Sequence, residues 1–68
     1  MTDNKLLLSI IDKNGLKLKF ISDKLGITQQ ALYNKVNGKS EFKVSEMNKL
    51  CEVLNLSNKE KKDIFFGN

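Results

Sequence analysis

Three glycines divide the first half of this chain into short segments and so restrict what it can fold into. They are Gly15, Gly26 and Gly38, at spacings of 11 and 12 residues. The residue just past the end of a helix often adopts a positive φ angle, which glycine reaches without steric cost. We therefore interpret these glycines as the ends of successive short helices.

Apolar side chains recur along the chain at the three-and-four spacing of one helix face. Five helices are expected, over residues 3–13, 17–24 and 29–36, over a stretch that contains Met47 to Leu54, and over a stretch that begins at Ser57. The second also alternates as a strand would from Leu16 to Phe20, but a lone strand would find no partner in this sequence. The sequence therefore predicts an all-α fold.

Polar residues before these segments have the chemistry of helix N-caps, whose side chains accept hydrogen bonds from free backbone amides. The candidates are Thr2 or Asp3 for the first helix, Thr28 for the third, Ser45 for the fourth and Ser57 for the fifth. Ser57 stands three residues before Glu60, which is the spacing of a capping box. Ile64 and Phe65 then follow as apolar anchors of the last helix.

The chain has 68 residues, one cysteine and no histidine. A chain of this length buries only about 60% of the surface that its unfolded form exposes, so we expect residues 1–68 to form a single domain around one core. One cysteine excludes an intrachain disulfide, and we assign Cys51 to the buried side of its helix. Without histidine the usual zinc ligand sets and proton shuttles are missing, so we expect no metal, no cofactor and no enzyme activity.

Charge points to the partner. All 12 basic residues are lysines, against eight carboxylates, which gives a net charge of +4 and a pI near 9.3. This balance favours a polyanion over an acidic small substrate, although a lysine-rich surface can also serve solubility alone. No apolar run approaches the roughly 20 residues that cross a bilayer. We therefore expect a cytoplasmic protein that has no membrane partner.

The third predicted helix leaves a polar face outside when its apolar side is buried. The outward residues are Gln29, Gln30, Tyr33 and Asn34. The major groove of DNA admits one α-helix, and glutamine or asparagine can make two hydrogen bonds at once to the edge of adenine. Two short helices joined by a glycine-containing turn, the second exposing amides, form a helix-turn-helix reader of DNA. We identify these four residues as candidate base contacts.

The Ile-Ser-Asp-Lys-Leu-Gly-Ile-Thr stretch at residues 21–28 and the Asn-Gly-Lys at 37–39 carry a family likeness. They resemble the Cro and C1-type (XRE-like) helix-turn-helix family of phage repressors and small bacterial regulators, and the likeness spans roughly Leu16 to Leu56. It implies a five-helix, lambda-repressor-like DNA-binding domain. In such a domain the second and third helices, here about residues 17–36, form the reading unit.

Carried over position by position, the resemblance implies two sets of contacts with double-stranded DNA. Gln29, Gln30 and Asn34 look like base-contacting residues. The residues that look like phosphate contacts are Thr28, Asn37, Lys39, Ser40 and Lys43. Two positions depart from the family: Leu18 stands where many members carry a phosphate-contacting Gln, and Ser22 stands where a small residue, usually Ala, lets the two helices approach closely.

The last helix offers a dimer contact. Phe65 and Phe66 are adjacent, so their side chains point about 100° apart and we expect one to pack on the core and the other to be partly exposed. A two-fold dimer through this pair would cover the exposed ring and place two reading helices about 34 Å apart, one turn of DNA. We therefore predict a weak homodimer, formed most clearly on DNA.

These observations favour a transcriptional regulator of the phage or prophage Cro or repressor type, which binds a palindromic operator and has no small-molecule ligand. A protein-interaction module on the same fold, such as an antitoxin or adaptor, is the alternative, and it would combine a large apolar patch with poor DNA affinity. A small catalytic domain is a remote third hypothesis, because no nucleophile and proton shuttle are paired in the sequence.

Overall fold

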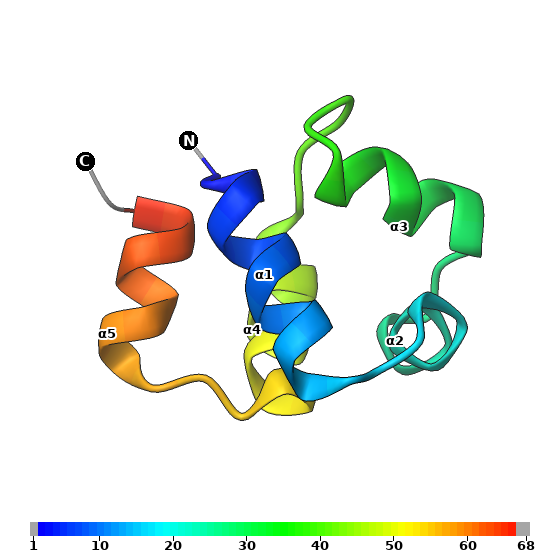
Figure 1. The fold of residues 1–68 in the computed structure, drawn as a ribbon. Coiled ribbons are helices and arrows are strands. Elements are labelled where there is room, and N and C mark those ends of the chain that lie inside the picture. The colour runs from blue at the N-terminus through cyan, green and yellow to red at the C-terminus, as the bar shows by residue number, and fades with distance from the viewer. Residues whose placement is uncertain (1, 67–68) are drawn as a thin grey trace.

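The computed structural model describes residues 2–66, and within this range the chain forms five α-helices and no strand (Figure 1). The helices are α1 (Asn4–Asn14), α2 (Leu18–Leu25), α3 (Gln29–Val36), α4 (Val44–Leu54) and α5 (Asn58–Lys61), which continues into a π-helical turn, η1 (Lys62–Phe66). The predicted all-α fold is confirmed. None of these helices is long and apolar enough to cross a membrane.

Most of the predicted helix ends are confirmed. Gly15 and Gly26 end α1 and α2 with φ angles of 69° and 74°, in the left-handed region that favours glycine. At the start of α1 the cap is Asp3, whose Oδ1 accepts from the Leu6 N–H at 3.0 Å. Ser57 and Glu60 form the expected capping box of α5. The Ser57 N–H donates to Oε1 of Glu60 at 2.9 Å, and the Glu60 N–H donates to Oγ of Ser57 at 3.1 Å.

The predicted N-cap of α4 is wrong. Ser45 lies inside the first turn, because α4 begins at Val44 and its N-cap position is Lys43. The free backbone amide there is satisfied from within the helix, where Oε1 of Glu46 accepts from the Lys43 N–H at 2.8 Å. A glutamate three residues into the helix thus supplies the half of a capping box that serves the amide of the N-cap residue.

The core lies where α1 and α4 cross the middle of the molecule (Figure 1). Helix α2 packs against α3 and α4, and α1 contacts α3, α4 and η1. The buried apolar residues are Leu7, Ile11, Ile21, Leu32, Val36, Phe42, Leu50, Leu54, Ile64 and Phe65. Cys51 is half-buried against this core, and burial raises the pKa of its thiol.

The two positions that depart from the family pattern both face inward. Ser22 is buried, and its Oγ–H donates to the Lys19 carbonyl at 2.9 Å, so the hydroxyl is satisfied without leaving α2. A small side chain at this point allows α2 and α3 to pack closely. Leu18 is half-buried and packs against the core. The first residue of α2 therefore anchors the helix.

The aromatic pair of the last helix divides as expected. Phe65 is 3% exposed, and its ring packs edge-on against the Phe42 ring with 5.9 Å between the ring centres. Phe66 is 63% exposed. Phe65 therefore belongs to the core of its own chain, and only Phe66 of the predicted dimer pair is placed to meet a partner. Close by, the Asp3 N–H donates to the Ile64 carbonyl at 2.6 Å and joins the start of the chain to η1.

Candidate nucleic-acid interface

Helix α3 starts and packs as its sequence dictates. Thr28 is its N-cap, and Oγ1 accepts from the Ala31 N–H at 3.0 Å. Leu32 and Val36 are buried and hold the helix against the core. Because the peptide dipoles of a helix are aligned, the N-terminus of α3 carries a partial positive charge, which favours a phosphate.

The four predicted base-contacting residues lie on the outer side of α3. Gln29, Gln30 and Tyr33 are exposed, and Asn34 is half-buried. Nε2 of Gln30 donates to Oδ1 of Asn34 at 3.1 Å, so these two amides form a row along one side of the helix. The atoms that this bond leaves unused, the Oε1 of Gln30 and the Nδ2 of Asn34, are one acceptor and one donor. An acceptor and a donor together are complementary to the N6–H donor and N7 acceptor that adenine presents in the major groove.

The side chains of Tyr33 and Lys39 contact each other near the C-terminal end of this face. Nζ of Lys39 lies 5.8 Å from the centre of the Tyr33 ring, within range of a cation–π interaction. The contact reduces the number of rotamers open to an otherwise exposed lysine side chain. It keeps an ammonium group beside the amide row.

The predicted phosphate contacts fall into two places. Thr28 is at the first turn of α3, and the other four are in the loop that follows its last turn: Asn37, Lys39, Ser40 and Lys43. Asn37 has a structural role as well, because its Nδ2 donates to the Tyr33 carbonyl at 2.8 Å and caps α3. The Lys39 N–H donates to the Asn34 carbonyl at 2.8 Å. The loop is therefore fixed to the helix that it follows.

Lys35 differs from the two loop lysines near which it lies in sequence. Its side chain is turned inward and makes an ion pair with Glu46, a contact that the sequence reasoning missed. The available signal was position: Lys35 follows buried Leu32 by three residues and precedes buried Val36 by one, at the edge of the apolar stripe. A lysine there can reach inward only when a carboxylate meets it.

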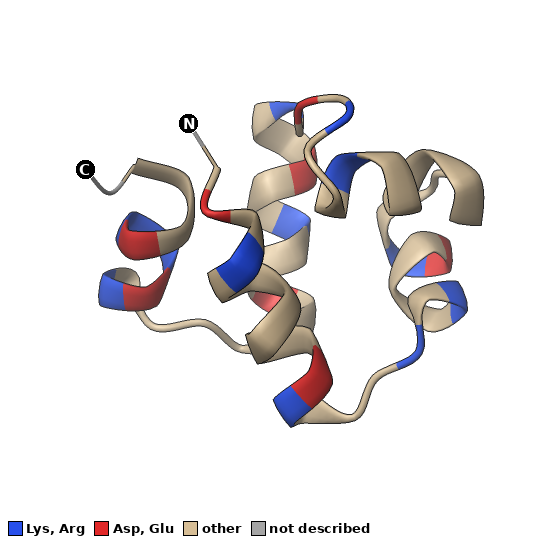
Figure 2. Ribbon diagram, turned by 45° about the horizontal axis from the view of Figure 1, so that its top comes forward, with Lys and Arg blue, Asp and Glu red and all other residues tan. Residues whose placement is uncertain are grey.

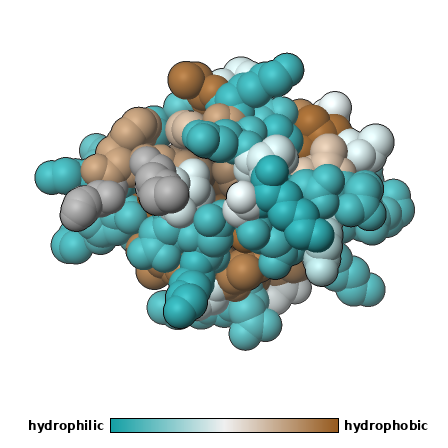
Figure 3. Space-filling view, turned by 90° about the horizontal axis from the view of Figure 1, so that it is seen from above, coloured by the Kyte–Doolittle hydropathy of each residue, from teal (hydrophilic) through white to brown (hydrophobic). Residues whose placement is uncertain are grey.

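The surface around this loop is mainly polar. Figure 2 shows lysine segments on the loop and at the end of α3, with acidic segments next to them. Seen from above, the same side of the molecule is mostly hydrophilic, and its hydrophobic patches are small and separate (Figure 3). This is the character of a surface that meets a charged, hydrated partner.

Glu46 gives the domain a dependence on pH. Burial raises the pKa of its carboxyl, but hydrogen bonds from the Lys43 N–H and the Lys35 ammonium, together with the positive charges of these two lysines, lower it by more, so the pKa lies below its ordinary value of 4.5. A lowered folded-state pKa stabilises the protein above 4.5, and this stabilisation is lost as pH falls through the folded value.

We expect the free energy of unfolding to fall as the solution is acidified below pH 4.5, and Glu46→Gln to remove part of that fall. Urea unfolding of both proteins across the acid range measures it. Glu52→Gln is the control, because this glutamate is 71% exposed and should leave the wild-type profile in place. Identical acid profiles for Glu46→Gln and wild type would contradict the assignment.

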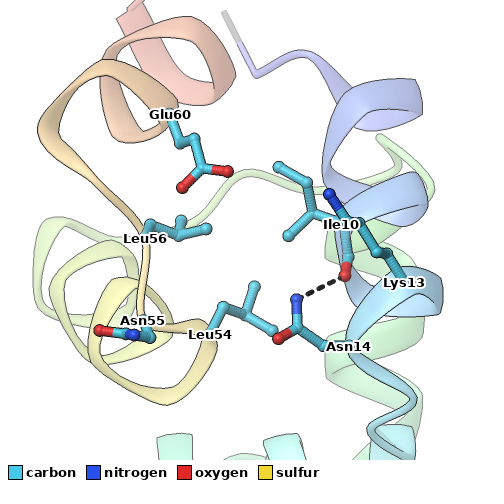
Figure 4. Close-up of a pocket in the computed structure, with 7 residues that line it drawn as sticks. All are labelled: Ile10, Lys13, Asn14, Leu54, Asn55, Leu56 and Glu60. Atoms are coloured by element: carbon cyan, nitrogen blue, oxygen red, sulfur yellow. Dashed lines mark hydrogen bonds between the residues drawn. The ribbon is translucent and has the colours of Figure 1, made fainter.

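A hollow lies away from α3, between the end of α1, the end of α4 and the start of α5 (Figure 4). It measures about 300 Å³, and Figure 4 shows Glu60 pointing into it from α5, opposite Ile10 of α1. Lys13 and Asn55 are also at its edge. A drug-sized ligand needs a mainly apolar pocket that covers most of its surface, and this hollow is open and largely polar. The expectation that no small molecule binds stays a prediction.

Comparison with known proteins gives one match. A family model described as helix-turn-helix matches residues 7–57, which include most of α1, all of α2, α3 and α4, and the loop after α3. Comparisons with curated proteins and with solved structures found no match. The matched region contains every predicted base and phosphate contact.

Proposed function

The chain belongs to the Cro/C1-type (XRE-like) helix-turn-helix family of DNA-binding regulators, and from this we propose that it recognises specific DNA sequences and regulates transcription. The observation that carries the proposal is the outer face of α3, where three exposed amide or phenol side chains and the amide of Asn34 lie between lysines and a capped N-terminus. We place it in the cytoplasm, where its DNA would be.

In the proposed complex α3 enters the major groove. An α-helix with its side chains is about 10–12 Å in diameter, close to the roughly 12 Å width of the groove. Gln29 and Gln30, in the first turn, reach deepest toward the base edges, and each can bind adenine through two hydrogen bonds. Asn34 and Tyr33 read one turn further along the helix.

Contacts at both ends of α3 fix its register on the duplex. Thr28 is placed beside one phosphate, and the loop residues Asn37, Lys39, Ser40 and Lys43 are placed beside others. Such contacts supply affinity and orientation but little sequence information, because every nucleotide presents the same phosphate. Phosphate contacts at both ends of α3 would hold the amide side chains between them in position to contact the bases.

Lys39→Ala should weaken binding to operator and random DNA alike. Each neutralised phosphate contributes about 0.9 to the slope of log affinity against log salt, so the slope should become shallower by about that amount. Titrations by fluorescence anisotropy at several salt concentrations measure it. Lys62→Ala, an exposed lysine at the start of η1, is the matched control, and an unchanged slope for Lys39→Ala would remove it from the phosphate set.

We further propose a phage- or prophage-type repressor that binds a palindromic operator as a weak homodimer. Exposed Phe66 supports this, since a two-fold contact through the last helix would cover its ring. Selection of binding sites from random DNA, followed by footprinting, tests both parts. Two half-sites about 34 Å apart are expected. A chain that binds no DNA even at low salt would favour the protein-interaction hypothesis.

A further inference from the structure

One ammonium group contacts both the loop between α3 and α4 and the helix that follows it. The side chain of Lys35 is only 12% exposed, and its Nζ lies 3.1 Å from Oε1 of Glu46 on α4, whose side chain is 9% exposed. The same Nζ donates to the backbone carbonyl of Glu41 in the loop at 2.9 Å. One buried charge therefore joins α3, the loop and α4.

Other contacts close around this ammonium. Nζ of Lys35 lies 6.0 Å from the centre of the Phe42 ring, which is itself buried against Phe65. Oε1 of Glu46 accepts a second hydrogen bond, from the Lys43 N–H. In Figure 2 the coloured lysine and glutamate segments of this region lie next to one another. Phe42 is the buried residue of the loop, and the residues with proposed phosphate contacts are all exposed: Asn37, Lys39, Ser40 and Lys43.

We propose that the Lys35–Glu46 ion pair is a positioning element, which holds the loop at residues 37–43 in the shape that meets the DNA backbone, and that Lys35 itself does not touch DNA. This inference rests on the proposed function. Removing one partner of a buried pair leaves the other charge unpaired, so the loop should shift when either residue is changed. The base contacts proposed for Gln29 and Gln30 come from the other end of α3 and should be affected less.

Glu46→Gln gives the sharpest test, because charge and positioning predict opposite results. The substitution removes a carboxylate and so raises the net charge above +4, which by itself should strengthen DNA binding. If the ion pair positions the loop, affinity for operator and for random DNA should instead fall about tenfold, with a salt slope shallower by about one phosphate contact. The preference for operator over random DNA should be nearly unchanged.

Two further variants separate positioning from charge and from folding. Glu52→Gln makes the same change in net charge at an exposed site on α4 and should bind at least as tightly as wild type. Lys35→Met with Glu46→Gln keeps the net charge at +4 and leaves no unpaired charge, so it should fold normally. It should still lose about tenfold in affinity. If it binds both DNAs as tightly as wild type does, whose net charge it shares, the positioning role is wrong.

Amide hydrogen exchange of the free protein checks the loop without DNA. The Lys39 amide is bonded to the Asn34 carbonyl, and it should exchange faster in Glu46→Gln and in the double variant than in Glu52→Gln. Unchanged exchange would overturn the inference. A wild-type chain that fails to bind DNA would overturn the proposed function instead, and the exchange rates would still decide whether the ion pair holds the loop.

Discussion

Replacing Gln29 and Gln30 together by alanine should remove the preference for operator DNA while leaving binding to random DNA nearly intact. Each bidentate contact to a base discriminates by about 1–3 kcal/mol, so the loss of two such contacts should cost about 2–6 kcal/mol in operator affinity. Neither side chain is buried, and the fold should be affected by less than about 0.5 kcal/mol.

Competition titrations with operator and random duplexes at fixed salt measure this difference. The salt slope should stay at the wild-type value, because both lost side chains are uncharged. Asn58→Ala, which removes an exposed amide from the start of α5, is the control and should bind both duplexes as wild type does. Equal weakening toward operator and random DNA would show that the two glutamines do not read bases.

Leu32→Ala should unfold most of the protein at moderate temperature. Leu32 is fully buried on the inner side of α3, and truncating such a leucine costs about 2–5 kcal/mol. Small domains are stable by only about 0.05–0.15 kcal/mol per residue, so the loss takes a large share of the total. The reading face would lose its support although none of its own side chains had changed.

Thermal unfolding followed by circular dichroism gives the comparison. Tyr33→Ala, the next residue on the same helix, is the matched control because its side chain is 48% exposed. It should leave the unfolding midpoint almost unchanged and affect only DNA binding. If the Leu32→Ala protein had the same unfolding midpoint as wild type, α3 would be held in place by other contacts.

Helix α3 shows how far local sequence signals reach. Its expected bounds, 29–36, agree with the structure at both ends, because Thr28 caps the start and the glycine after Asn37 stops the helix. Helix α2 starts one residue later than expected, at Leu18, since no side chain caps it. Local hydrogen bonding of this kind depends on neighbours in sequence and can be read from them.

Contacts between distant residues could not be predicted in the same way. The carboxylate of Glu46, on α4, meets Lys35, which is on another helix. Only the packing of α3 against the core decides that this lysine turns inward. The stacking of Lys39 on Tyr33 is likewise set by the turn between them. The sequence indicates the types of the site residues, and the fold decides which of them are restrained.

The hydrogen bond from the Asp3 N–H to the Ile64 carbonyl holds the start of α1 beside η1 (Figure 1), and the next residue, Asn4, donates through its Nδ2 to the Lys35 carbonyl in the last turn of α3 at 3.1 Å. The first turn of α1 therefore links the last helical turn of the chain to the end of the recognition helix. A change in that turn would act on both ends of the fold at once.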